Sequence, residues 1–179
     1  MTTMPTPKAF MMGAGRVSGA LAGALRLAGV PVLGLWGRRE AEAREAASAS
    51  GVAGYFAALP EILRATEVVI LAVDDDAVSG VAESLLDSGL VARGQVLLKC
   101  SGSEPAERTL AKVAGRVGGV GTLHPLRAIA DAREAATTMR GTTFGIEGDA
   151  GGLAMARRLV DLLGGKPLVL SGADLAVYH

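Results

Sequence analysis

The feature that most constrains this chain is a glycine turn, Gly13 to Gly15, that lies between an apolar run and a helical pattern. The apolar residues 8–12 predict a strand, and the alanine- and leucine-rich residues 17–27 predict a helix. A strand, a glycine turn and a helix in this order are typical of the segment that binds the phosphates of a dinucleotide. Gly13 permits the sharp turn, Gly15 lets an anion approach the backbone, and the helix N-terminus offers free N–H groups. The expected nucleotide contacts are Gly13, Ala14, Gly15, Arg16 and Val17. The alternative is a glycine turn that occurs by chance and binds no nucleotide.

Composition excludes several classes of partner. The 179 residues are 50% hydrophobic and 20% charged, which is typical of one globular domain. A formal net charge of zero and an aromatic content of 3% argue against a nucleic-acid-binding surface. No uncharged run reaches the roughly 20 residues of a membrane span, and residues 1–7 lack a signal-peptide pattern. The single cysteine, Cys100, excludes an internal disulfide. We therefore expect a soluble, cytoplasmic protein with no nucleic-acid and no membrane partner.

Strands and helices are predicted to alternate along the whole chain. The expected strands are residues 8–12, 31–36, 52–55, 68–73, 95–98, 118–123, 143–146 and 167–170. The expected helices are residues 17–27, 39–48, 59–64, 77–87, 104–113 (with Ser103 as its N-cap) and 153–163. This alternation predicts an α/β fold with a doubly wound, mostly parallel sheet. We divide the chain into a disordered tail at 1–7, a nucleotide-binding domain at 8–170 and a connection at 171–179.

The end of the second predicted strand indicates which nucleotide would bind. NAD-specific domains usually carry Asp or Glu there, about 20 residues past the glycines, to accept hydrogen bonds from the ribose hydroxyls. This chain has Arg38 and Arg39 instead. A guanidinium can grip a 2′-phosphate through two charge-assisted hydrogen bonds, so NADP is favoured over NAD. The alternative is that one of the arginines only solvates the start of the next helix.

Other strand ends carry small and polar residues. Ligands of such sheets bind at the carboxyl ends of the strands, near the point where the strand order reverses. The candidates that this rule adds to the cofactor site are Val73, Asp74, Asp75 and Ser101. Three consecutive acids, 74–76, point in alternate directions on an extended chain, so we expect no metal site. We interpret them as an N-cap for the following helix and as a backbone contact to the nicotinamide ribose.

His124 is the candidate catalytic residue. It follows the sixth predicted strand, and an imidazole titrates near neutral pH. Its position favours an acid/base or substrate-positioning role, and the alternative is a structural hydrogen bond that fixes the loop before Pro125. Lys99 and Ser101 are alternative polar groups at the same edge, whereas Cys100 is interpreted as a small buried residue.

Several motifs together resemble a known family over essentially the whole chain. They are Gly13–Val17, Val73–Asp76, Ser101-Gly102, Leu123–Leu126, Phe144–Asp149, and Gly172–Asp174 through Tyr178-His179. The chain resembles the N-terminal portion of Rossmann-like oxidoreductases that carry a C-terminal helical domain of unknown function. Their relatives are pyrroline-5-carboxylate reductase, ketopantoate reductase and 6-phosphogluconate dehydrogenase. The chain departs from the pattern at Asp74, where members typically show proline, and at Lys99 and Cys100, where they show histidine and threonine.

The resemblance implies an NADP-dependent oxidoreductase that transfers hydride to or from a small carbonyl, imine or alcohol. In this family the segment from Tyr178 opens a helix toward a domain that builds the homodimer and covers the substrate. We therefore expect the 179-residue chain to be a fragment that binds the cofactor but is catalytically incomplete. The alternatives are a non-catalytic nucleotide-binding or sensing module, and an interaction domain that binds no nucleotide.

Overall fold

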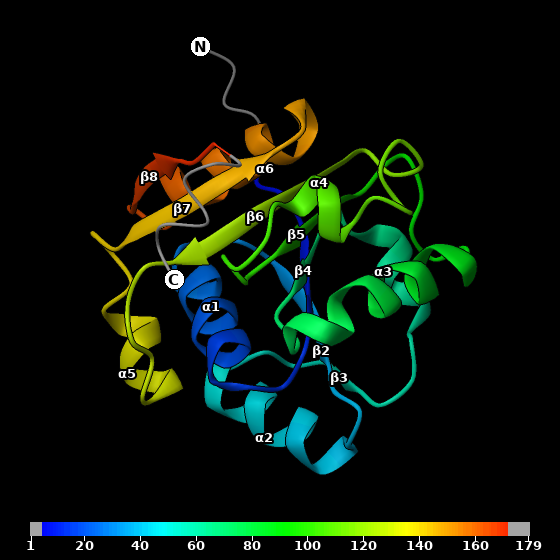
Figure 1. The fold of residues 1–179 in the computed structure, drawn as a ribbon. Coiled ribbons are helices and arrows are strands. Elements are labelled where there is room, and N and C mark those ends of the chain that lie inside the picture. The colour runs from blue at the N-terminus through cyan, green and yellow to red at the C-terminus, as the bar shows by residue number, and fades with distance from the viewer. Residues whose placement is uncertain (1–4, 172–179) are drawn as a thin grey trace.

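The computed structural model describes residues 5–171. In this part of the chain eight strands form one sheet, in the order β3-β2-β1-β4-β5-β6-β7-β8 (Figure 1). The strands are β1 (Ala9–Met12), β2 (Val32–Trp36), β3 (Tyr55–Phe56), β4 (Val68–Leu71), β5 (Val96–Lys99), β6 (Gly119–Pro125), β7 (Thr143–Gly148) and β8 (Lys166–Val169). The order reverses between β1 and β4, as in a doubly wound sheet.

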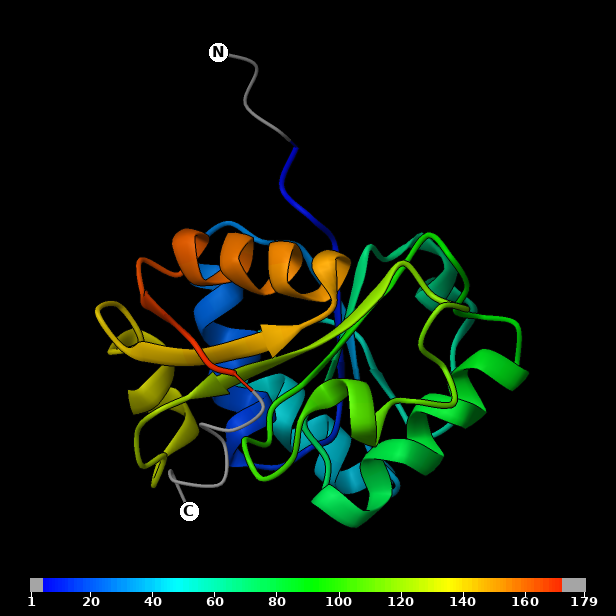
Figure 2. The same cartoon turned by 45° about the horizontal axis from the view of Figure 1, so that its top comes forward.

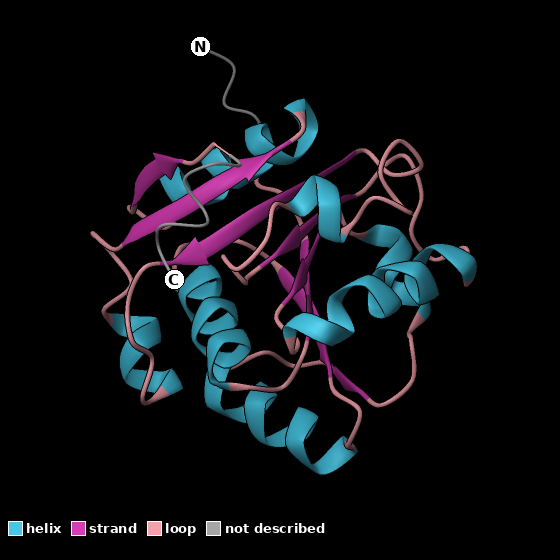
Figure 3. Cartoon of the chain, in the orientation of Figure 1, coloured by secondary structure: helices cyan, strands magenta, loops and turns pink. Residues whose placement is uncertain are grey.

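Helices alternate with these strands and cover both faces of the sheet (Figure 3). The α-helices are α1 (Arg16–Leu27), α2 (Glu40–Ser50), α3 (Val78–Asp87), α4 (Ala106–Thr109), α5 (Ala132–Thr137) and α6 (Ala150–Leu162). Two short 3₁₀ helices are η1 (Glu61–Ala65) and η2 (Asp75–Ala77). All strand pairs are parallel except β6 and β7. The predicted doubly wound, mostly parallel sheet is therefore confirmed.

The alternation of side chains along each strand divides the core into two layers. Ala9 and Met11 of β1 pack with α1, α2, α5 and α6, whereas Phe10 and Met12 pack with α3 and α4. All four side chains are fully buried. Figure 2 shows α6 over one face of the sheet and α3 on the other side. Because both faces of the central strands are covered, these strands are continuously apolar rather than alternating.

Glycines let two helices approach their neighbours closely. A Cβ on Gly152 of α6 would lie 2.0 Å from the carbonyl oxygen of Val120 in β6. A Cβ on Gly23 of α1 would lie 2.8 Å from Cβ of Ala136 in α5. These contacts fix α6 against β6 and α1 against α5 at distances that larger residues would not allow.

Two local predictions differ from the structure. The helix expected at 104–113 is reduced to α4, since N–H bonds from Val113 to Leu110 and from Arg116 to Val113 span three residues and form turns. Ser103 does not cap this helix, because its hydroxyl donates to Asp75 Oδ2 at 2.7 Å. Helix α5 is not predicted from the sequence, although Asp131 at its N-cap accepts a hydrogen bond from the backbone N–H of Glu134.

Parts of the predicted domain division lie outside the described residues. Of the tail expected at 1–7, only residues 5–7 are described, and they form neither helix nor strand. Of the connection expected at 171–179, only Ser171 is described. Within residues 5–171 no helix is long and apolar enough to cross a bilayer.

The close approach of α6 to β6 predicts a large difference between two glycine-to-alanine variants. Gly152→Ala should lower the free energy of unfolding by about 3 kcal/mol, because the new methyl group would overlap backbone atoms of β6. The control is Gly80→Ala, in an exposed part of α3 with no atom within 4 Å of the new methyl group. It should change stability by no more than about 1 kcal/mol, in the favourable direction. Urea unfolding followed by circular dichroism measures both, and equal stability of the two variants would contradict the packing described.

Candidate functional site

The turn between β1 and α1 requires glycine at position 13. Gly13 has φ +122°, and a Cβ there would lie 2.1 Å from the carbonyl oxygen of Ala72. The turn is also held from the helix side, where the buried hydroxyl of Ser18 donates to the Gly13 carbonyl at 2.6 Å. Ser18 stands at the third glycine position of the motif, so it adds a hydrogen bond to the close packing expected of a small residue.

Gly15 leaves an open surface at the N-terminus of α1. It is the exposed N-cap of the helix, with extended backbone and no side-chain cap, and a Cβ there would meet no atom within 4 Å. The first N–H groups of α1, beginning at Arg16 and Val17, therefore meet no capping side chain from the N-cap residue. A helix N-terminus of this kind attracts anions through its N–H groups and its partial positive charge. The shape and the charge both fit a pyrophosphate.

Two cavities meet at this glycine turn. The first, here called the β2 cavity, measures about 320 Å³ and is lined by Gly13, Ala14, Gly15, Trp36, Gly37, Arg38, Arg39, Glu42, Ala72, Val73, Asp74, Ala77 and Val81. The second, here called the β6 cavity, measures about 550 Å³ and is lined by Gly15, Arg16, Val17, Ala72, Val73, Asp74, Asp75, Cys100, Ser101, Gly102, His124, Pro125, Arg127 and Ile129. Four residues, Gly15 and 72–74, line both. The predicted cofactor contacts and His124 each lie in one of the two cavities or in both, whereas the alternative candidate Lys99 lines neither.

The β2 cavity carries two exposed arginines, each beside a carboxylate. Arg38 Nη2 lies 3.9 Å from Asp74 Oδ2, and Arg39 forms an ion pair with Glu42. The side chains of Arg38 and Arg39 are 81% and 77% exposed. Exposed ion pairs of this kind are weak, so both guanidinium groups remain available to a ligand anion.

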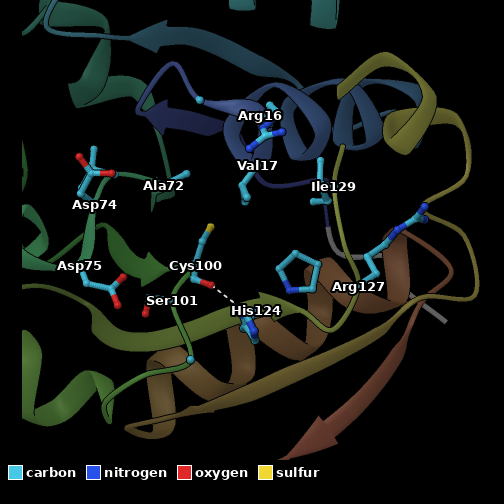
Figure 4. Close-up of a pocket in the computed structure, with 14 residues that line it drawn as sticks. Arg16, Val17, Ala72, Asp74, Asp75, Cys100, Ser101, His124, Arg127 and Ile129 are labelled. Atoms are coloured by element: carbon cyan, nitrogen blue, oxygen red, sulfur yellow. Dashed lines mark hydrogen bonds between the residues drawn. The ribbon is translucent and has the colours of Figure 1, made fainter. Parts of the chain in front are cut away.

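Figure 4 shows how the β6 cavity is built. Cys100, Ser101 and His124 line one side, and Arg16 and Val17 lie opposite. Asp74 and Asp75 are at one end, with Ile129 and Arg127 at the other. Arg127 and Ile129, in the loop after β6, were not identified from the sequence, because an irregular loop has no periodicity that shows which side chains turn inward.

His124 is held in one tautomer by the backbone. Its Nδ1 lies 2.6 Å from the carbonyl oxygen of Cys100 (Figure 4). A carbonyl can only accept a hydrogen bond, so Nδ1 carries the hydrogen and donates it. In the neutral ring Nε2 is then an acceptor, and in the protonated ring it is a donor. The structural and the acid/base interpretation of His124 are therefore compatible, since each uses a different ring nitrogen.

Lys99 and Cys100 point to opposite faces of the sheet. The buried Lys99 side chain lies on the α3 side, away from the β6 cavity, and its Nζ donates to the carbonyl oxygen of Ser101 at 2.6 Å. Burial lowers its pKa, and the carboxylate of Glu147 opposes this shift. Lys99 is thus a support for the loop at Ser101 and not a group that faces the cavity, which corrects the alternative drawn from the sequence.

Cys100 is buried, as the sequence predicts. Burial raises the pKa of its thiol to about 12, so the thiol stays protonated at neutral pH. A protonated thiol is a poor nucleophile. Although Cys100 lines the β6 cavity, it serves as a small wall residue.

The residues at the two N-cap positions beside the acidic run do not cap a helix with their side chains. Neither Asp74, at the N-cap of η2, nor Ala77, at the N-cap of α3, makes a side-chain capping bond. The 3₁₀ turn over Asp75–Ala77 already bends the chain into α3, and the Asp74 carboxylate lies near Arg38 instead. The predicted N-cap role is therefore wrong. Within residues 5–171 no group of three or more His, Cys, Asp or Glu side chains is placed to hold a metal ion.

A parallel sheet with cavities at the reversal of its strand order, joined by a glycine turn into a helix, is the arrangement of doubly wound α/β domains. The chain belongs to the Rossmann-like domain family, whose model matches residues 5–125. The family resemblance seen in the sequence is therefore confirmed. No curated protein matches the chain in sequence.

Solved structures share the fold. A candidate NADP oxidoreductase from Bacteroides fragilis has a TM-score of 0.77 at 21% identity, over 97% of this chain and 63% of its own. An imine reductase from Streptomyces aurantiacus has a TM-score of 0.66 at 26% identity, over 95% and 58%. A pyrroline carboxylate reductase from Plasmodium falciparum, solved with NADP bound, has a TM-score of 0.70 at 14% identity, over 97% and 61%. Another match, a prephenate dehydrogenase from A. aeolicus, was solved with NAD⁺. The chain spans about three fifths of the length of these proteins.

The raised pKa of Cys100 predicts slow alkylation of the native protein. At pH 8 a thiol of pKa about 12 is ionised in about one molecule in ten thousand. Iodoacetamide should therefore label the folded chain about a thousandfold more slowly than the chain unfolded in guanidinium, whose single thiol has an ordinary pKa. Below its pKa the native rate should rise about tenfold for each pH unit, as long as the fold persists. Mass spectrometry of quenched samples measures both rates, and equal rates at pH 8 would contradict the buried thiol.

Proposed function

We propose that this chain is the NAD(P)-binding domain of an oxidoreductase and that it prefers NADP. The observation that carries the proposal is the open surface over Gly15, at the place where the β2 and β6 cavities meet. A dinucleotide needs a site for its central pyrophosphate and a cavity on either side of that site. The glycine turn offers the site, and the β2 and β6 cavities lie on its two sides.

The residues of each cavity fit one half of the cofactor. In the proposed arrangement the β2 cavity takes the adenosine half, and Arg38 and Arg39 bind the 2′-phosphate. Ala14, Gly15, Arg16 and Val17 hold the pyrophosphate at the N-terminus of α1. The β6 cavity takes the nicotinamide half, with Val73, Asp74, Asp75 and Ser101 on its wall.

The cofactor, when bound, supplies hydride transfer. The chain's own contribution is orientation and a proton-accepting or proton-donating atom, which we assign to Nε2 of His124. A carbonyl, imine or alcohol group placed beside this atom can exchange a proton with it. Two proteins of similar fold, an imine reductase and a pyrroline carboxylate reductase, support a small substrate of this class. In the full-length protein we propose a homodimer whose further domain covers the substrate.

Replacing the arginines of the β2 cavity tests the cofactor preference. We expect NADPH to bind tenfold to a hundredfold more tightly than NADH, because a charge-assisted hydrogen bond contributes about 1.5–3 kcal/mol. Arg38→Ala and Arg39→Ala should each reduce that ratio without weakening NADH. Calorimetric titration at low salt measures the affinity of each protein for NADPH and for NADH. Arg64→Ala is the control, since Arg64 is exposed but outside both cavities. Equal affinities of the unaltered chain for NADPH and NADH would contradict the preference.

Gly15→Val tests the pyrophosphate site. The new side chain would fill the open space over the turn, so we expect NADPH binding to be lost while the circular dichroism spectrum stays unchanged. Gly94→Val is the control, because Gly94 is also exposed with no atom near an added Cβ, and it lies far from the turn in sequence and outside both cavities. If the folded Gly15→Val protein bound NADPH as the control does, the turn would have only a structural role.

A further inference from the structure

A pair of oppositely charged side chains spans the glycine turn. Arg38 lies just beyond the end of β2 and Asp74 just beyond the end of β4, and these strands flank β1 on its two sides. Both segments touch the turn, since a Cβ on Gly37 would lie 2.8 Å from Cβ of Ala14 and a Cβ on Gly13 would overlap Ala72. The carboxylate of Asp74 therefore reaches Arg38, at 3.9 Å, across the turn itself.

This ion pair is exposed and contributes little to stability. The two side chains are 81% and 83% accessible to solvent, and pairs of this kind are largely screened. The position of Asp74 differs from that of Glu42, the partner of Arg39. Glu42 lies three residues after Arg39, on the same helical turn. Asp74 comes from the opposite wall of the β2 cavity, so a ligand that binds Arg38 meets it as a separate charge.

We propose that Asp74 determines nucleotide specificity, because its carboxylate opposes a 2′-phosphate at Arg38 and so narrows the preference for NADP over NAD. This inference rests on the proposed function. A phosphate monoester carries about two negative charges at neutral pH, and it must either displace the Asp74 carboxylate from Arg38 or remain beside a like charge. An unphosphorylated ribose meets the opposite situation, because its hydroxyl groups can donate to that carboxylate.

The test compares two adenosine nucleotides that differ only in the 2′-phosphate. Adenosine 2′,5′-bisphosphate and adenosine 5′-monophosphate are titrated calorimetrically into the unaltered chain and into Asp74→Asn, which keeps the shape of the side chain but removes its charge. We expect the variant to bind the bisphosphate about threefold to tenfold more tightly and the monophosphate equally or more weakly. The difference in bisphosphate affinity between the variant and the unaltered chain should shrink as the salt concentration is raised, because the charges are exposed.

Asp76→Asn is the matched control. Asp76 belongs to the same acidic run and its loss changes the net charge equally, but it does not line the β2 cavity. In Asp76→Asn the ratio of the affinity for the bisphosphate to the affinity for the monophosphate should stay within about twofold of the ratio for the unaltered chain.

The outcomes separate the two proposals. An unchanged ratio in Asp74→Asn, with both nucleotides bound by the unaltered chain, overturns the role of Asp74 and leaves the proposed function in place. An equal rise of the ratio in Asp76→Asn also overturns it, because net charge would then explain the effect. If the unaltered chain binds neither nucleotide, both proposals fail.

Discussion

The contact between the glycine turn and the end of β4 is the constraint on which the site depends. With no side chain at Gly13, the backbone passes directly against the carbonyl group of Ala72. That contact brings 72–74 beside the turn and makes them a wall shared by both cavities. The hydrogen bond from Ser18 to the Gly13 carbonyl then fixes the turn to α1. A larger residue at position 13 would push the end of β4 away from the turn. The residues 72–74 would then no longer separate the β2 cavity from the β6 cavity.

The position of α1 depends in turn on a helix that lies far along the chain. Gly19 and Gly23 face the Cβ atoms of Ala132 and Ala136 of α5, so the two helices pack closely through small residues. A helix held this closely has little freedom to shift, because interiors are close-packed. The loop after β6 leads directly into α5 and carries Arg127 and Ile129, so one segment both supports α1 and borders the β6 cavity.

Local signals in the sequence were sufficient for most of the fold and for the strand-end residues of the site. The glycine turn, the apolar run at Val68–Leu71 and Arg38 after the second strand each depend on neighbouring residues alone. The antiparallel direction of β7 depends on how distant segments pair, which periodicity does not record. The face to which Lys99 points follows from the two-residue alternation with Cys100, and that signal was present but not used. The acidic run 74–76 was interpreted as the N-cap of the following helix because the 3₁₀ turn at η2 is not visible in the sequence.

The hydrogen bond between His124 and Cys100 has a consequence for how the imidazole works. Because Nδ1 is already engaged with a carbonyl group, the ring is oriented before any ligand arrives. Gaining or losing a proton at Nε2 changes that atom between acceptor and donor while the bond at Nδ1 is kept. In the proposed acid/base role the ring would therefore need no rotation between accepting and donating a proton. A reversible reaction would find the same geometry from either side, with little reorganisation to slow it.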